Sequence, residues 1–138
     1  MLLSVRINNM RMVMKSRVLI AEPDEDLALT YLEYFERYSE FEANIVLNGK
    51  ECREQLIEYA PDVLVCEPDL LDDFSSDILD DAKLPVIVLS RFEDTELGTH
   101  PAVIEFFVKP ILLQRLAACI RDSMSLPKQT ATDPSSNA

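Results

Sequence analysis

The sequence predicts a single α/β domain built around a parallel sheet. Short apolar runs alternate with longer stretches in which apolar residues recur at helical spacing. Strands and helices in alternation are typical of a parallel sheet covered by helices on both faces and joined by right-handed crossovers. A length of 138 residues suits one domain with its own core.

Five runs are the expected strands. Residues 18–21, 63–66 and 85–89 are continuously apolar, which indicates strands buried on both faces of the sheet. Residues 42–47 are more polar, so we expect this strand at an edge, and Pro110 ends the fifth strand at 103–108. The predicted strand order is 2-1-3-4-5.

The expected helices separate these strands. Helical spacing of apolar residues predicts helices over 25–38, 50–59 and 111–125, the last docked by Leu112, Leu116 and Ile120. Residues 68–81 are acidic and predict a loop with a short helix near 76–82, and residues 91–102 support at most a short helix. The third and fourth helices are therefore expected to be short.

The net charge of −12 is unevenly distributed. Residues 1–17 hold four basic side chains and no acid, so the rest carries −16. An acidic body repels phosphates, which disfavours nucleic acid as a partner of this domain. We expect residues 1–16 to be a disordered basic extension, 17–126 to be the domain, and 127–138 to be a disordered tail or linker.

Neither a membrane segment nor a redox centre is indicated. No apolar run is long enough to span a bilayer and the start lacks a continuous apolar core, so a cytoplasmic location is expected. The three cysteines lack metal-binding spacing and are expected to be buried hydrophobes. Two glycines cannot build a glycine-rich phosphate loop, which disfavours a nucleotide- or flavin-binding domain.

Residues that follow the strands form the candidate site, because ligands of such sheets bind outside the carboxyl ends of the strands. Carboxylates follow the first and third strands, a hydroxyl follows the fourth and a lysine follows the fifth: Glu22, Asp24, Glu67, Asp69, Ser90 (with Arg91 next to it) and Lys109. Clustered carboxylates need a cation to neutralise them, and Lys109 is the expected partner. Such a pocket suits a divalent metal and a phosphoryl group.

Four segments in order make residues 17–124 resemble the receiver domain of two-component response regulators. They are RVLIAEPDEDL, NGKECREQLIEYAPDVLVCEPDLL, LPVIVLS and FFVKPI. The resemblance implies a flavodoxin-like (CheY-like) three-layer α/β/α sandwich. It also implies that Glu67 holds the phosphoacceptor position, that Phe106 is the switch aromatic, and that the Lys109–Pro110 peptide is cis.

Two departures from the receiver pattern alter the expected chemistry. The family's phosphoacceptor is an aspartate where this chain has Glu67, and its acidic pair becomes Glu22 followed by Pro23, which has no ligand. Asp24 remains as a carboxylate one position further on. We therefore expect no cofactor, with weak Mg²⁺ binding at Glu22 and Asp24 as the exception.

Glu67 allows two interpretations. Its longer side chain partly mimics a phosphoryl group, with Lys109 paired to it and Ser90 donating a hydrogen bond, or it merely forms a structural ion pair with Lys109. Both favour a non-enzymatic, phosphorylation-independent interaction or dimerisation module that uses the fifth strand and last helix. The alternative is a phosphoacceptor receiver in which Glu67 or Asp69 accepts phosphate with Mg²⁺.

Overall fold

The computed structural model describes residues 15–72, 83–93 and 101–132, with the side chains of 71–72 and 125–132 excepted. Its core is one five-stranded sheet with the order β2-β1-β3-β4-β5, in which every pair is parallel. The strands are β1 (Ser16–Ala21), β2 (Phe41–Val46), β3 (Val63–Cys66), β4 (Val86–Ser90) and β5 (Val103–Val108). The predicted strand order and the edge position of the second strand are confirmed.

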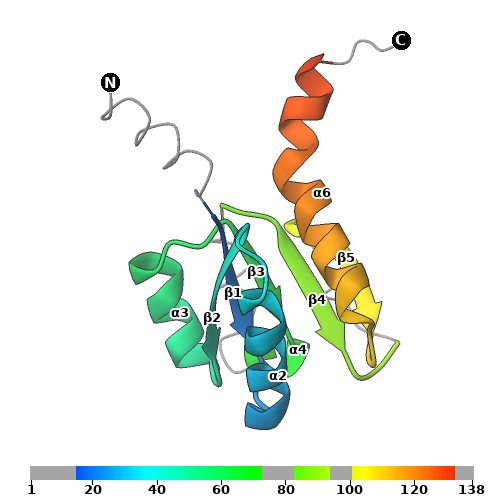
Figure 1. The fold of residues 1–138 in the computed structure, drawn as a ribbon. Coiled ribbons are helices and arrows are strands. Elements are labelled where there is room, and N and C mark those ends of the chain that lie inside the picture. The colour runs from blue at the N-terminus through cyan, green and yellow to red at the C-terminus, as the bar shows by residue number, and fades with distance from the viewer. Residues whose placement is uncertain (1–14, 73–82, 94–100, 133–138) are drawn as a thin grey trace.

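The strand register places the candidate site residues at one edge of the sheet. Ala21 pairs with Cys66 and with Val46, and Ser90 pairs with Val108. The strands therefore end together, at the lower end of the sheet in Figure 1. Glu22, Glu67 and Lys109 each follow one of these strand ends directly.

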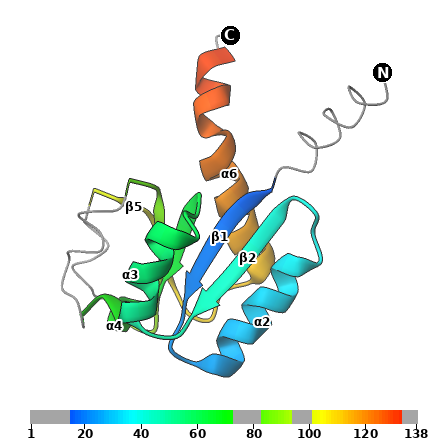
Figure 2. The ribbon, with the colours of Figure 1, turned by 90° about the vertical axis from the view of Figure 1, so that its left-hand side faces the viewer.

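Helices cover the two faces of the sheet in pairs (Figures 1 and 2). α2 (Glu25–Glu36) and α6 (Leu113–Thr132) pack one face through Tyr31, Phe35, Leu116 and Ile120. α3 (Gly49–Glu58) and the short α4 (Pro68–Asp72) pack the other through Cys52 and Leu70. The result is the expected three-layer α/β/α sandwich.

The side chains that begin α2 and α3 act as helix N-caps. Asp24 accepts a hydrogen bond from the Leu27 amide at 3.3 Å, and Asn48 accepts one from the Glu51 amide at 2.8 Å. Each satisfies an amide that has no partner within its helix. Asp24 is thus held at the edge of the sheet where the strands end.

Three local expectations were wrong. Residues 68–72 form α4 directly after β3, because Pro68 suits a first helical position, where its missing N–H costs nothing. α6 continues past Ser125 and through Pro127 to Thr132, and its last turns project beyond the sheet (Figures 1 and 2). Leu112 precedes α6 and is 72% exposed, so Leu116 and Ile120 dock the helix without it.

Other expectations lie outside the described residues. These are the short helix near 76–82, most of the 91–102 segment, and the terminal segments 1–14 and 133–138. Where the structure does describe the chain, it holds no helix long and apolar enough to cross a membrane.

Candidate functional site

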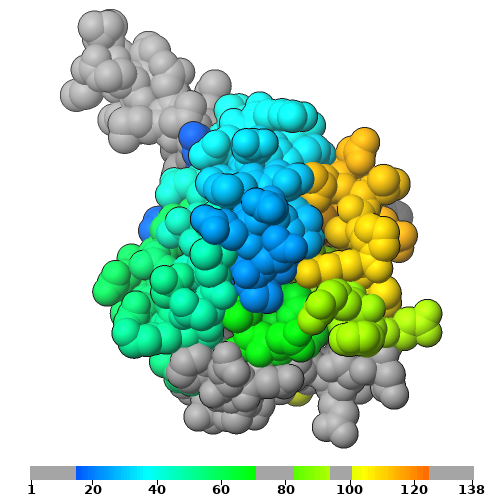
Figure 3. All heavy atoms as spheres, turned by 90° about the horizontal axis from the view of Figure 1, so that it is seen from below, coloured from blue at the N-terminus to red at the C-terminus, as the bar shows by residue number. Residues whose placement is uncertain are grey.

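A pocket of about 690 Å³ lies at the edge of the sheet where the strands end. Four carboxylates and two cations line it: Glu22, Asp24, Glu67, Asp69, Arg91 and Lys109. Figure 3 looks onto this edge, where the start of α2, the residues after β3 and β4, and the start of α6 meet. The structure thus brings the predicted carboxylates and the predicted lysine together.

Two hydrogen bonds hold Glu22 at the end of β1. Its amide donates to the Val46 carbonyl at 3.0 Å, which continues the ladder between β1 and β2. Its Oε2 accepts a hydrogen bond from the Asp24 amide at 3.1 Å. The side chain is buried, so it faces the pocket interior and not the solvent.

Glu67 repeats the same arrangement at the end of β3. Its amide donates to the Ala21 carbonyl at 3.0 Å, and its Oε1 accepts from the Asp69 amide at 2.8 Å. Both glutamates belong to the tripeptide Glu-Pro-Asp, which the sequence repeats at 22–24 and 67–69. This repeat is the signal by which the two equivalent turns could have been recognised from the sequence.

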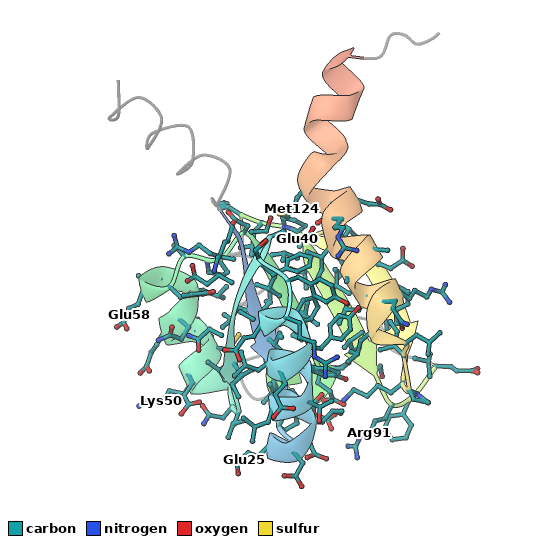
Figure 4. The ribbon with its side chains drawn as sticks, in the orientation of Figure 1. Glu25, Glu40, Lys50, Glu58, Arg91 and Met124 are labelled. Carbon is teal, nitrogen blue, oxygen red and sulfur yellow. The ribbon has the colours of Figure 1, made fainter. Side chains whose placement is uncertain are left out.

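The ion pairs in the pocket differ from the expected ones. Lys109 Nζ lies 2.6 Å from Glu22 Oε1, so the expected pairing of Lys109 with Glu67 is wrong. Glu67 Oε2 lies 3.6 Å from Arg91 Nε, and Arg91 Nη2 lies 2.9 Å from Asp69 Oδ2. Arg91, labelled in Figure 4 at the lower edge of the molecule, is therefore the basic residue that pairs with the carboxylates following β3.

Burial controls the electrostatics of Glu67. Removal of its carboxylate from water raises the pKa of Glu67, and the charges of Asp69 and Glu22 add to this effect. The hydrogen bond from the Asp69 amide and the charge of Lys109 act in the opposite direction. The net rise in pKa indicates that ionised Glu67 is only partly compensated by its surroundings.

The remaining predicted residues lie as follows. Ser90 is buried at the end of β4, where its Oγ accepts from the Phe92 amide at 3.0 Å, and no hydrogen bond among the described residues joins it to Glu67. The expected hydrogen bond from Ser90 to Glu67 is therefore wrong. Phe106 is half-buried against the α3 side of the core. The Lys109–Pro110 peptide bond is cis.

The donor groups do not fit a magnesium site. Lys109 and the Asp24 amide occupy the two oxygens of Glu22, Pro23 offers no side-chain ligand, and Asp24 caps α2. Mg²⁺ requires near-octahedral oxygen ligands, and Lys109 and the Asp24 amide compete with it for the Glu22 oxygens. In the part of the chain that the structure describes, no three His, Cys, Asp or Glu side chains are placed to share a metal.

The fold matches solved receiver domains. The receiver domain of the Francisella response regulator 1452 is 21% identical with a TM-score of 0.69, covering 82% of this chain and 99% of that one. The N-terminal domain of a response regulator/sensory box/GGDEF protein from Carboxydothermus hydrogenoformans gives 18% identity and a TM-score of 0.68, covering 83% and 98%.

A third solved structure gives the same result. The response regulator domain of Thermotoga maritima CheB is 21% identical with a TM-score of 0.66, covering 80% of this chain and 97% of that one. No family model matches the chain, and no curated protein matches it. The chain therefore has the fold of response regulator receiver domains, the CheY-like flavodoxin fold that the sequence predicts.

Proposed function

We propose that this chain is a receiver-like signalling domain that acts without phosphorylation, as a protein-interaction or dimerisation module. One observation carries the proposal: the carboxylate at the phosphoacceptor position, Glu67, is 3% exposed and engaged by the Asp69 amide and Arg91. An incoming phosphodonor requires a free oxygen in line with the phosphorus and a metal to neutralise its charge. In this proposal the Asp69 amide and Arg91 hold the Glu67 carboxylate in place, and Pro23 supplies no ligand for such a metal.

The lysine of the pocket supports the same conclusion. In the receiver pattern Lys109 is the residue that would contact a phosphoryl group. Here it is almost buried and forms a close ion pair with Glu22. Binding a phosphoryl group would leave the buried Glu22 carboxylate without its cation, which is costly. In this proposal the chain turns over no substrate, and its signal is the surface that it presents.

The test is incubation with acetyl phosphate and Mg²⁺, followed by intact mass spectrometry. We expect no mass gain, while a receiver domain with an aspartate phosphoacceptor gains one phosphoryl group in the same buffer. A stoichiometric gain that Glu67→Gln abolishes would refute the proposal.

A second candidate function rests on Asp69. Its carboxylate is half-exposed at the pocket mouth, with Arg91 as its cation. If Asp69 accepts the phosphoryl group, the same experiment shows a mass gain that Asp69→Asn abolishes and Glu67→Gln leaves intact. The two variants therefore distinguish the two possible acceptors from each other and from an inert domain.

The proposed partner surface is the outer face of β5 and α6. Ile104 and Val108 are exposed on β5, and Ile104 lines a groove of about 350 Å³ between β5 and α6. Glu105, Arg115 and Asp122 line this groove and supply charges of both signs. A mixed apolar and charged face of this kind suits a protein partner or a second copy of the chain.

A further inference from the structure

A second hollow, distinct from the charged pocket, lies between α2 and the connection from β5 to α6. This α2 groove encloses about 560 Å³ and is lined mainly by Leu27, Tyr31, Arg91, Pro110, Ile111 and Leu113. Sites for small molecules commonly have volumes of this size and apolar walls with few polar groups. Lys109 and Arg91 line both hollows, so they form the wall between them.

Tyr31 and Thr30 are the neutral polar residues that line the α2 groove, and Thr30 already donates its hydroxyl to the Asp26 carbonyl at 2.9 Å. Tyr31 is 3% exposed, and its hydroxyl makes no hydrogen bond with any of the described residues. Within those residues, the one fully enclosed polar side-chain atom without a partner is Arg17 Nε. The Tyr31 hydroxyl is therefore not fully enclosed, and because Tyr31 lines the α2 groove, a ligand in the groove can supply the missing hydrogen-bond partner.

The surroundings keep this hydroxyl protonated. Burial raises the pKa of Tyr31, and the negative charges of Glu22, Asp24 and Glu67 raise it further. A phenol next to these carboxylates is a hydrogen-bond donor at every physiological pH. A ligand that pairs with the Tyr31 hydroxyl must therefore carry a hydrogen-bond acceptor.

The charges at the groove wall disfavour a charged ligand. Lys109 is paired with Glu22, and Arg91 is paired with Asp69 and Glu67, so an anion would compete with these carboxylates for either cation. The adjoining pocket holds four carboxylates against two cations, so its net charge repels anions. A cation would have to leave water for a groove whose walls are apolar, at a cost in desolvation.

We propose that the α2 groove binds a small neutral molecule with an apolar body and one acceptor, such as a carbonyl oxygen. The body lies against Leu27, Ile111 and Leu113, and the acceptor receives the Tyr31 hydroxyl. This proposal is independent of the proposed function, because it involves no phosphoryl group and no part of the β5–α6 face.

The test uses acetophenone as the probe, followed through the methyl NMR signals of the protein. We expect the signals of Leu27, Ile111 and Leu113 to shift saturably. Tyr31→Phe keeps the buried ring and removes only the hydroxyl, so it should weaken binding about threefold to tenfold. Tyr59→Phe is the matched control: its hydroxyl donates to the Glu42 carbonyl away from the groove, and binding should be unchanged.

Two further probes separate the hydroxyl contact from general apolar binding. Toluene lacks the acceptor and should bind both wild type and Tyr31→Phe with the same weak affinity. Benzoate carries a charge and should not bind at neutral pH. The proposal is overturned if acetophenone moves none of the three methyl signals up to its solubility limit, or if Tyr31→Phe binds it as tightly as wild type.

Discussion

Lys109 and Glu22 form a nearly buried ion pair, with 2.6 Å between Nζ and Oε1 and side chains 12% and 4% exposed. The pair joins the end of β5 to the end of β1, across two intervening strands of the sheet. With Lys109 held by Glu22, Arg91 is the ion-pair partner of Glu67, while the charge of Lys109 still lowers the pKa of Glu67 against the rise caused by burial. The pocket therefore contains three ion pairs around two cations, Lys109 with Glu22 and Arg91 with Asp69 and Glu67, in place of one cluster around a lysine.

Removal of this lysine is expected to destabilise the fold. Lys109→Met leaves the Glu22 carboxylate buried without its cation, and we expect the free energy of unfolding in urea to fall by about 3 kcal/mol. Adding Glu22→Gln to Lys109→Met should restore more than half of the loss. Lys50→Met is the matched control, because its pair with Glu54 is exposed and should contribute less than about 0.5 kcal/mol. Equal losses in the two lysine variants would contradict the role given to the buried pair.

The raised pKa of Glu67 predicts a pH-dependent stability. A carboxyl group whose pKa is higher in the folded state than in the unfolded state lowers the stability of the fold at pH values where it is ionised. This loss of stability decreases as the pH falls from the folded pKa towards the unfolded pKa. Glu67→Gln should therefore be more stable than wild type at neutral pH, with the difference narrowing in acid. Urea unfolding of wild type and Glu67→Gln, at neutral pH and at acidic pH, measures this difference in stability.

Glu40 is a control for which the pKa shift, and therefore the effect of pH on stability, has the opposite sign. Hydrogen bonds from Arg121 lower the pKa of Glu40, so this pair stabilises the fold above the unfolded pKa of Glu40 and stops doing so in acid. Figure 4 shows Glu40 beside α6, at the end of the molecule away from Arg91. Glu40→Gln should lose stability at neutral pH and resemble wild type in acid. If Glu67→Gln instead lost stability at neutral pH, as Glu40→Gln is expected to, the buried Glu67 carboxylate would not destabilise the fold.

Association through the β5–α6 face can be tested with one added charge. Ile104 is 46% exposed on β5, and Ile104→Glu should abolish self-association or partner binding that uses this face, as measured by sedimentation equilibrium. Ile57→Glu is the matched control, since Ile57 is equally apolar and more exposed, on α3. If wild type stays monomeric at every concentration and no partner binding depends on Ile104, the proposed surface is wrong.

The sequence predicts the fold because its strands are so strongly apolar. Residues 63–66 form β3 with the predicted bounds, since Pro61 and Glu67 delimit a run of four buried apolar residues. The end of α6 was not predictable from Pro127, because a proline signals a helix end but does not require one. The start of α4 was missed because acidic content suggested a loop, whereas Pro68 is compatible with a first helical turn.

The members of the site were predictable, but their partners were not. Strand order alone places Glu22, Glu67 and Lys109 at one edge, and it leaves both glutamates within reach of the lysine. Which one it contacts depends on side-chain directions that no spacing encodes. Arg91 follows the fourth strand and had no predicted role, because an arginine in a polar stretch usually faces solvent. The repeated Glu-Pro-Asp indicates two equivalent turns and leaves the cation of each glutamate undetermined.

The last prediction concerns restoring phosphorylation. Glu67→Asp shortens the acceptor side chain, and Pro23→Asp adds a carboxylate at an exposed position that already lines the pocket. The added carboxylate is not committed to Lys109, so it is available to Mg²⁺. We expect the double variant to gain one phosphoryl group from acetyl phosphate, as measured by intact mass.

The single variants identify which defect dominates. Glu67→Asp alone still lacks the metal ligand, and Pro23→Asp alone still has the longer, engaged carboxylate, so neither should gain a stoichiometric phosphoryl group. Lys109 must leave Glu22 to contact the phosphoryl group, so the double variant should accept phosphate slowly. If it gains none while remaining folded and binding Mg²⁺, the pair of Lys109 with Glu22 is itself the block. Adding Glu22→Asp, which retracts that carboxylate from the lysine, should then restore the reaction.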